Sequence, residues 1–432
     1  MPARGPWIDH FGDNFLWSNA TLILKGMAPY GVVSLEEMDR ACEKLRARQG
    51  ETDKGKAWFE EWRALGDQIE KRGDDALAKG HKVTAGDYYL RAGIYHYNAE
   101  RFIQPGPAKK AQCAHAYKVW HTGIKLRQPN VEFIEVPYDG TTLPALFMKS
   151  SEPGPRPTVV VVNGMDNAKE MSIFFCGLEF ARRGYNTLCL DGPGMGEMRR
   201  MRDMPSRFDY EVPGTAALDY LLTRKDVDPK RVAIMGYSFG GYYSSRIAAF
   251  EKRYAACIAL SALHWDLAAW QQKIKDANKD KPGSVAQSNF QWRWVAGAED
   301  EDGGIEIAKK FSLKDVAKNI TCPFLVTHAG NDRVVPLRDI EDERADAQCF
   351  APGESRSSES EGLERRARRR TPADEVIPNP EPIDRQLGNL VSALKPFAGI
   401  EPNGSKGDAD ARRSPSHRDA STTCARRARR RR

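Results

Sequence analysis

The chain has 432 residues, 41% of them apolar and 29% charged, which is enough for two or three domains and a sizeable core. Its net charge of +7 is concentrated in residues 346–432, which hold 18 Lys and Arg against 13 Asp and Glu, so no basic face for nucleic acid is expected. The chain has no uncharged apolar run of ~18 residues and no apolar leader, so we expect neither a membrane span nor secretion. The eight cysteines form no C-x-x-C pair, which favours free thiols and a cytoplasmic protein.

Residues 1–130 are predicted to form a helical cap domain. Aromatic and aliphatic side chains recur at helical spacing across residues 54–72, and another helix is expected near residues 108–123. Thr84 followed by Asp87 resembles a capping box and predicts the start of an aromatic helix. These aromatic stripes are typical of helix–helix packing; the alternative is that some of them line a substrate pocket.

Residues 131–345 show a different pattern, in which short apolar runs alternate with helical stretches. Residues 131–137 and 143–148, separated by Asp-Gly, predict a β-hairpin. The further expected strands are 158–162, 187–190, 232–235, 257–260 and 324–327, and the expected helices are 169–182, 212–223 and 239–250. This alternation indicates an α/β fold with a mostly parallel sheet covered by helices on both faces. Residues 264–311 interrupt it and are interpreted as an insertion over the carboxyl edge of the sheet.

The chemistry-bearing motif is G-x-S-x-G at residues 236–240, directly after a predicted buried strand and directly before a predicted helix. This context is typical of a nucleophile elbow, a tight turn that exposes a serine and needs small neighbours at both flanking glycine positions. Ser238 is therefore the candidate nucleophile. The backbone N–H of Phe239, at the helix start, is the candidate first donor to the oxyanion of acyl transfer.

Two further site residues are expected at the same edge of the sheet. The loop after the strand at 158–162 should supply a second oxyanion donor, for which we choose the N–H of Met165. Asp332 follows the last predicted strand and is the candidate triad acid. Asp266 and Asp191 are alternatives for the acid, although Asp191 begins a D-G-P-G stretch that is more typical of a structural turn.

The general base is the missing element of the predicted triad. It should be a histidine downstream of Asp332, and the only one there is His417, within the Arg-, Ser- and Pro-rich tail. His328 lies on the last predicted strand and is interpreted as structural, and His264 in the insertion is a weak substitute. No metal site and no cofactor are expected.

Several of these stretches together resemble a known family. They are the N-terminal helices with the hairpin, the segments at residues 163–170 and 191–197, the elbow, and His328-Ala-Gly-Asn-Asp332. The resemblance is to the α/β-hydrolases typified by 2,6-dihydroxypseudooxynicotine hydrolase, with fungal heptaketide-shortening hydrolases in the same group, and it covers roughly residues 20–340. It implies a helical cap, a Ser-Asp-His triad, in many members a homodimer, and hydrolysis of a carbon–carbon bond beside a ketone.

The sequence after about residue 345 departs from that family, which carries its histidine about thirty residues past the acid. Residues 346–432 are predicted to be disordered, and one hypothesis is a shift of reading frame near residues 340–350. The expected function is a serine hydrolase acting on a small carbonyl substrate, either a 1,3-diketone or an ester of a hydrophobic or aromatic compound. The alternative is an impaired or non-catalytic relative without its base, and a nucleic-acid role for the terminal arginines is not expected.

Overall fold

The computed structural model describes residues 9–12, 14–260, 265–278, 286–328 and 332. All of these residues belong to one compact unit of the chain. The predicted tail at residues 346–432 therefore lies outside the described residues, as do the expected tail disorder and frame change.

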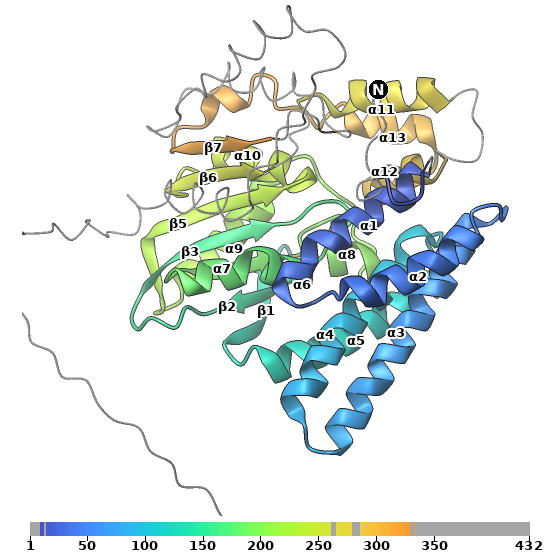
Figure 1. Cartoon of the computed structure of the whole chain (residues 1–432). Helices are drawn as coiled ribbons and strands as arrows, with labels where there is room; N and C mark the ends of the chain where they lie inside the picture. Colours follow the sequence, from blue (N-terminus) through green and yellow to red (C-terminus); the bar gives the residue numbers. More distant parts are fainter. Residues whose placement is uncertain (1–8, 13, 261–264, 279–285, 329–331, 333–432) are drawn as a thin grey trace, which may run out of the picture. The chain divides into compact units, whose positions relative to one another are not determined.

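The first described part of the chain is helical (Figure 1). Its elements are α1 (Phe15–Met27), η1 (Ala28–Tyr30), α2 (Leu35–Ala47), α3 (Lys54–Ala78), α4 (Lys82–Ala99), η2 (Glu100–Phe102) and α5 (Pro107–Arg127). The predicted capping box at Thr84 and Asp87 is wrong, because α4 begins two residues before Thr84 and its N-cap is His81. The Asp87 carboxylate instead accepts a hydrogen bond from Nε of Arg127 on α5 at 2.5 Å.

Helices α4 and α5 pack closely because glycines lie at their contact points. A Cβ on Gly93 would lie 2.8 Å from Cα of Trp120, and a Cβ on Gly123 would lie 2.7 Å from the backbone nitrogen of Leu90. Both distances are shorter than normal packing allows, so the two helix backbones approach more closely than they could with alanine at these positions. The helical segment, by which we mean α1 to α5, is therefore tightly packed where α4 meets α5.

A seven-stranded sheet follows in the order β1-β2-β4-β3-β5-β6-β7. Its strands are β1 (Val131–Tyr138), β2 (Thr141–Met148), β3 (Arg156–Val162), β4 (Asn186–Leu190), β5 (Val227–Tyr237), β6 (Ala256–Leu260) and β7 (Phe324–Thr327). Strand β2 is antiparallel to β1 and β4, and the pairs from β4 to β7 are parallel. The predicted hairpin and the mostly parallel sheet are thus confirmed.

Successive residues of the central strands enter two different hydrophobic cores, as expected for a sheet covered on both faces. Val159 and Val161 of β3 join the core formed with the N-terminal helices, whereas Val160 and Val162 join the opposite core. The helices of this region are α6 (Lys169–Ser172), the π-helical η3 (Ile173–Gly177), α7 (Leu178–Arg182), α8 (Gly196–Arg200), α9 (Glu211–Leu222) and α10 (Phe239–Phe250). Figure 1 shows α7 and α9 beside the central strands.

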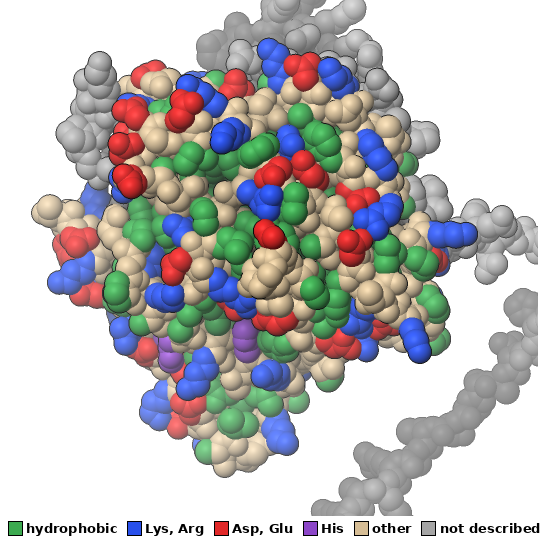
Figure 2. All heavy atoms as spheres, turned by 180° about the vertical axis from the view of Figure 1, so that it is seen from behind, with side chains coloured by type: hydrophobic (Ala, Val, Ile, Leu, Met, Phe, Trp, Pro, Cys, Tyr) green, Lys and Arg blue, Asp and Glu red, His purple; other side chains and the backbone are tan. Residues whose placement is uncertain are grey.

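The predicted insertion contains three helices within its described residues. They are α11 (Leu267–Asn278), α12 (Ala286–Ala296) and α13 (Glu301–Ala308), and the short η4 (Ala317–Asn319) precedes β7. On the face seen in Figure 2, acidic and basic side chains are interspersed, so no large patch of one sign appears there. Among the residues that the structure describes, no helix is both long and apolar enough to cross a bilayer.

Candidate active site

Ser238 forms the turn between β5 and α10. Its backbone has φ 54° and ψ −133°, a sparsely populated conformation that costs a non-glycine residue roughly 1–3 kcal/mol. Its N–H donates to the carbonyl of Leu260 on β6 at 3.0 Å, and its carbonyl accepts from the N–H of Gly241 at 2.8 Å. Tyr237 and Phe239 on either side are buried while Ser238 is exposed. The turn therefore lifts a single side chain out of the core at the end of the strand.

The two flanking glycines of the motif are required by their surroundings. A Cβ on Gly236 would lie 1.8 Å from the carbonyl oxygen of Gly240, and a Cβ on Gly240 would lie 2.3 Å from the carbonyl oxygen of Val162. Both obstacles are backbone atoms, which cannot rotate away as a side chain could. Gly236 is thus required by the tightness of the turn itself, and Gly240 by how closely the turn passes the end of β3.

The loop after β3 crosses directly over Ser238. Strands β3 and β5 are neighbours, and Val162 pairs with Gly236. A Cβ on Gly164 would lie 2.7 Å from Cβ of Ser238 and 3.0 Å from its Oγ. Met165, the predicted second oxyanion donor, is the next residue and is half-buried. The structure therefore brings the Met165 loop and the Ser238 turn together.

Phe239 is the first residue of α10, so its N–H lies at the positive end of the helix dipole. Its ring is buried among aromatic residues, with ring centroids 4.9 Å from Tyr243, 5.7 Å from Trp292 and 6.0 Å from Phe311. Trp292 belongs to α12, so the insertion packs against the start of the helix that follows Ser238. This packing holds the Phe239 side chain in place at the start of α10.

Strand β7 ends at the same edge of the sheet as β5. Tyr237 pairs with Leu260, and Leu260 pairs with Thr327, so His328 follows β7 two strands away from Ser238. Two strand spacings of about 4.8 Å separate their backbones by roughly 10 Å. Asp332, the predicted acid, is half-buried and follows four residues after His328.

The other two candidate bases, His264 and His417, lie outside the described residues. The structure therefore brings together the predicted nucleophile and the segments of both predicted donors, and it places His328 at the same edge.

Asp266, one alternative for the acid, has a structural role at the start of α11. Its Oδ1 accepts a hydrogen bond from the N–H of Ala269 at 3.0 Å, which is the geometry of a helix N-cap. Its backbone also forms an isolated bridge with Ser312. Asp266 thus ties the insertion to the chain before β7.

Asp191, the other alternative, is fully buried at the end of β4 and anchors the loop that crosses Ser238. Its Oδ1 accepts from Nδ2 of Asn163 at 2.7 Å and from the N–H of Lys169 at 2.8 Å. Its Oδ2 accepts from the N–H of Glu197 at 2.9 Å and lies 3.4 Å from Nζ of Lys169. Since Asn163 and Lys169 are at the two ends of the loop, this one carboxylate holds both ends.

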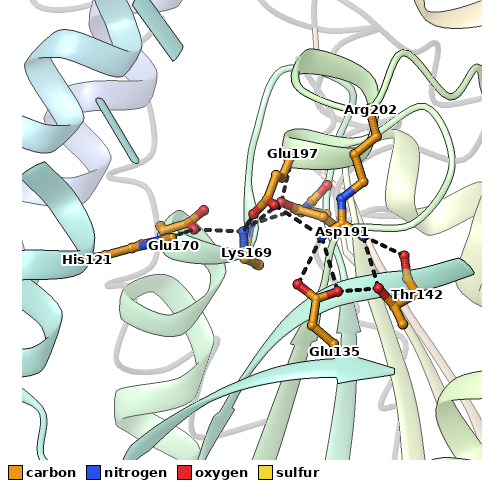
Figure 3. Close-up of polar contacts among 9 residues, drawn as sticks. His121, Glu135, Thr142, Lys169, Glu170, Asp191, Glu197 and Arg202 are labelled. Carbon is orange, nitrogen blue, oxygen red and sulfur yellow. Dashed lines mark hydrogen bonds and ion pairs between the residues drawn. The ribbon is translucent and has the colours of Figure 1, made fainter. Parts of the chain in front are cut away.

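Figure 3 shows how the network spreads from Lys169 in two directions. The ammonium of Lys169 contacts Glu170 at 2.8 Å and Glu197 at 2.7 Å, and Glu170 also accepts from Nε2 of His121 on α5 at 2.7 Å. On the other side, Arg202 joins Glu197 at 3.3 Å to Glu135 of the hairpin at 2.9 Å. The network links the sheet, the loop and the N-terminal helices.

Charge and burial act against each other in this network. Burial alone would raise the pKa of Glu170, but the charges and hydrogen bonds of Lys169 and His121 outweigh it and lower the pKa to about 2. Burial raises the pKa of Asp191, and the nearby Glu170 adds to this effect while Lys169 opposes it. The ammonium of Lys169 stays charged, because three carboxylates outweigh the cost of its burial and raise its pKa.

A pocket lies where the N-terminal helices meet the loop after β3. It is lined by Ile23, Leu24, Ile94, Tyr97, Asn98, Glu100, Arg101, Asp166 and Met171. Tyr97 donates to the backbone carbonyl of Asp166 at 3.3 Å, and Arg101 contacts its carboxylate at 2.8 Å. Asp166 is two residues after Gly164, so the pocket wall continues into the loop over Ser238. Nδ2 of Asn98 is buried in this wall and has no hydrogen-bond partner among the described residues.

A buried ion pair joins the same helices to the sheet region. Nε of Arg200 on α8 lies 2.7 Å from Oε1 of Glu100, and Lys109 on α5 also contacts this carboxylate. The guanidinium of Arg200 lies over the Tyr97 ring at 4.9 Å and over the Trp294 ring at 5.4 Å. All three charged groups are almost inaccessible to solvent. The pair is therefore part of the core between the helical segment, α8 and the insertion.

Known proteins resemble this chain in sequence and in fold. Residues 214–342 match the model of the prolyl oligopeptidase family, a span that includes the Ser238 turn and β7. The chain superposes on the crystal structure of 2,6-dihydroxy-pseudo-oxynicotine hydrolase with a TM-score of 0.61 and 25% identity, covering 75% of this chain and 85% of that one. The chain has the α/β-hydrolase fold. The predicted fold class is thereby confirmed, including the helical region before the sheet.

The chain also aligns in sequence with named hydrolases of this fold. An α/β hydrolase of Xenoacremonium sinensis is 27% identical over 365 residues, covering 74% of this chain and 83% of that protein. The 2,6-dihydropseudooxynicotine hydrolase of Paenarthrobacter nicotinovorans is 27% identical over 282 residues, covering 64% of this chain and 71% of that protein. The 20-hydroxy-prefusarin hydrolase of Gibberella moniliformis is 27% identical over 310 residues, covering 64% and 74%. The suspected family resemblance is confirmed by these relatives.

The sequence pattern did not reveal the residues that support this α/β-hydrolase site. Lys169, Glu170 and Asp191 lie in the two stretches that carried the family resemblance, but only the structure shows that they contact one another. Tyr97 and Arg101 were visible only as part of an aromatic helix. Both residues are far from Asp166 in the sequence, so no local spacing predicts their contacts with it.

Proposed function

We propose that this α/β-hydrolase is a serine hydrolase that works through an acyl-enzyme, with Ser238 as its nucleophile. The observation that carries the proposal is the exposed, strained conformation of Ser238 at the end of β5, with the Gly164 backbone directly over it. A strained side chain persists only where the surroundings enforce it, and such strain gathers at active sites. A serine that served only as part of a strand–helix turn would not need this conformation.

The reaction follows from the groups around Ser238. Its Oγ forms a bond to the substrate carbonyl carbon while a general base takes its proton, and the N–H groups of Phe239 and Met165 stabilise the oxyanion. In a 1,3-diketone, collapse of this intermediate breaks the carbon–carbon bond, and the departing electron pair forms an enolate that takes a proton. Water then attacks the acyl-serine and releases a carboxylic acid. An ester follows the same course with an alcohol as the leaving group.

Asp332 is the proposed acid of the relay, which would orient a histidine and stabilise its charged form. The histidine itself is to be found among His328, His264 and His417. Of these three, His328 belongs to the part of the chain that the structure describes, and it lies at the sheet edge. It can act as the base only if its ring reaches across β6 to Ser238. Single alanine substitutions at these three positions identify the base by the loss of reactivity at Ser238.

The proposed substrate is a hydrophobic or aromatic ketone with polar substituents. The support is the chemistry of the relatives, which are named as hydrolases of pseudooxynicotine and prefusarin derivatives.

The decisive experiment is fluorophosphonate labelling of the full chain, with the modified residue located by mass spectrometry and Ser238→Ala as control. We expect rapid modification of Ser238 alone and none in the variant, with both proteins equally folded by circular dichroism. A reactive sample is then given matched 1,3-diketones and aryl esters, and release of acid plus ketone identifies carbon–carbon cleavage. A folded chain that does not react contradicts the proposal.

The second candidate function is a relative that binds carbonyl compounds without efficient turnover. Its support is that His417 is the only histidine after Asp332 in the sequence. Residual hydrolysis does not exclude it, because serine proteases that lack a triad member keep ~10³–10⁴-fold catalysis over water. The rate of fluorophosphonate labelling distinguishes the two functions. The first predicts that one histidine substitution slows labelling of Ser238, and the second predicts that none does.

A further inference from the structure

Two histidines and two carboxylates converge in the N-terminal helices, within the part of the chain that the structure describes. They are Asp67 and Glu70 on α3, His96 on α4 and His115 on α5, and one ligand atom of each lies within 4.8 Å of all the others. Asp67 and Glu70 are three residues apart, so both project from the same face of α3. None of the four belongs to the proposed hydrolase site.

The geometry of the cluster centres on one carboxylate oxygen. Oε2 of Glu70 lies 3.0 Å from Nε2 of His96 and 2.8 Å from Nε2 of His115. Oδ1 of Asp67 lies 3.8 Å from Nε2 of His96. Ligands bound to one tetrahedral zinc at about 2.1 Å lie about 3.4 Å from one another. The observed spacings bracket this value, so small side-chain rotations would place all four atoms around one ion.

We propose that Asp67, Glu70, His96 and His115 form a binding site for a divalent transition-metal ion of the zinc class. Imidazole nitrogens together with carboxylate oxygens are a ligand set that suits zinc and its neighbours, whereas calcium and magnesium prefer oxygen alone. Sites of this kind in helical bundles take their ligands from facing helices, as here. The site rests on neither Ser238 nor the proposed reaction.

The surroundings of His96 support a fixed ligand rather than a mobile surface side chain. His96 is fully buried, and its ring fills the space beside Gly66, where a Cβ would lie 2.6 Å from Nδ1. Gln112 lies behind the ring, with its amide group 3.5 Å from Nδ1 and hydrogen-bonded to the His96 carbonyl at 3.0 Å. Nε2 of Gln112 makes both contacts, so this amide holds the ring with the Nε2 atom of His96 turned toward Glu70.

The accessibility of the cluster is graded from buried to exposed. His96 has none of its side chain exposed, Glu70 has 23%, His115 has 41% and Asp67 has 56%. An ion can therefore enter from solvent and meet one preplaced imidazole at the bottom of the site.

A bound ion would tie α3, α4 and α5 together. Metal binding adds to folding stability wherever the ligands come together only in the folded chain. Residue 97, which follows His96 on α4, is the tyrosine that contacts the Asp166 loop. The consequence of binding is therefore a more stable helical segment next to the pocket wall.

The test uses the full chain stripped with chelator and then titrated with Zn²⁺ and, for visible absorption, Co²⁺. His115→Ala and Glu70→Gln are the variants, because both positions are partly exposed and tolerate change, and His81→Ala is the matched control. We expect wild type and control to bind one equivalent that each variant binds at least about tenfold more weakly. Zn²⁺ should raise Tm in wild type and control more than in the variants.

Comparison with the variants also corrects for metal that binds to other histidines, such as His264 and His417, because these are the same in all samples. Equal affinity and equal Tm gain in wild type, His115→Ala and Glu70→Gln would overturn the proposal. In that case Glu70 is only a hydrogen-bond acceptor shared by two imidazoles. A weak Co²⁺ spectrum that the variants do not change leads to the same conclusion.

Discussion

Asn163 donates from its side-chain amide to the carboxylate of Asp191 at 2.7 Å, and this bond joins the residue before Gly164 to the first residue after β4. Both residues are fully buried. Because the Gly164 backbone lies directly over Ser238, the position of the proposed oxyanion loop depends on a carboxylate that does not touch the nucleophile. Asp191 is thus a positioning residue in the proposed mechanism.

Asn163→Ala should slow fluorophosphonate labelling of Ser238 by about 10- to 100-fold, because a shift of about 1 Å at a reacting group can cost a factor of ~10². The control is Asn130→Ala, which removes the bond from another asparagine amide to the carbonyl of Lys149, away from the site. Labelling rates of folded samples are compared by mass spectrometry. Equal rates in the two variants would show that the loop does not need this bond.

Lys169→Met should destabilise the folded chain by about 3–5 kcal/mol at pH 7, because it leaves Asp191 and Glu170 buried without their cation. Lys56→Met is the control, since that side chain is 65% exposed and its loss should change stability by no more than about 0.5 kcal/mol. Urea unfolding followed by circular dichroism gives both values. If Lys169→Met lowers the free energy of unfolding by less than about 1 kcal/mol, the Lys169 ammonium does not stabilise the two buried carboxylates as argued.

Gly123→Ala should destabilise the helical segment by about 1–3 kcal/mol, because its Cβ would collide with the backbone nitrogen of Leu90. Gly26→Ala in α1 is the matched control, since nothing lies within 4 Å of a Cβ there. Alanine is the better helix former, so the control should be neutral or more stable by up to about 1 kcal/mol. Thermal unfolding distinguishes the two, and equal Tm shifts would contradict the close approach of α4 and α5.

The stability of the chain should fall in acid partly through Glu100. Burial would raise the pKa of Glu100, but Arg200 and Lys109 lower it from 4.5 to about 2. A carboxylate whose pKa is lowered by folding stabilises the folded state above its unfolded pKa, and this contribution is lost as pH falls from about 4.5 to about 2. Urea unfolding at pH 6, 4 and 3 measures it. The free energy of unfolding of Glu100→Gln should be lower than that of wild type at pH 6 and should fall less steeply as the pH is lowered. If the free energies of the two proteins fall in parallel, other groups cause the acid sensitivity.

The parts of the site that the sequence predicted are those with a local cause. Glycines at 236 and 240 around Ser238, between a β-branched run and a helix, can only be explained by a tight exposed turn, and the structure has it. The helix at 239–250 and the strand at 324–327 were also predicted to the residue. These features depend on neighbours within a few residues, which is the range over which sequence patterns are informative.

The parts that were missed depend on contacts between distant residues. Asp191 was considered as a catalytic acid, and only its bonds to Asn163 and Lys169 show it as an anchor. The four residues of the Glu70 cluster, Glu70 included, come from three helices and form no recognisable spacing in the chain. The capping box at Thr84 failed for the opposite reason, because a local signal was overridden by a helix that begins earlier.

The buried pair of Glu100 and Arg200 limits how a substrate can reach Ser238. The pair joins the helical segment to α8, and the hydrogen bonds of Tyr97 and Arg101 join it to the loop over the serine. Swinging the helices away as a rigid lid would break this pair and these hydrogen bonds together and would expose the core packed around them. Helices and sheet should therefore behave as a single body during turnover. Substrate would then enter and product leave through smaller movements of side chains and loops around the pocket.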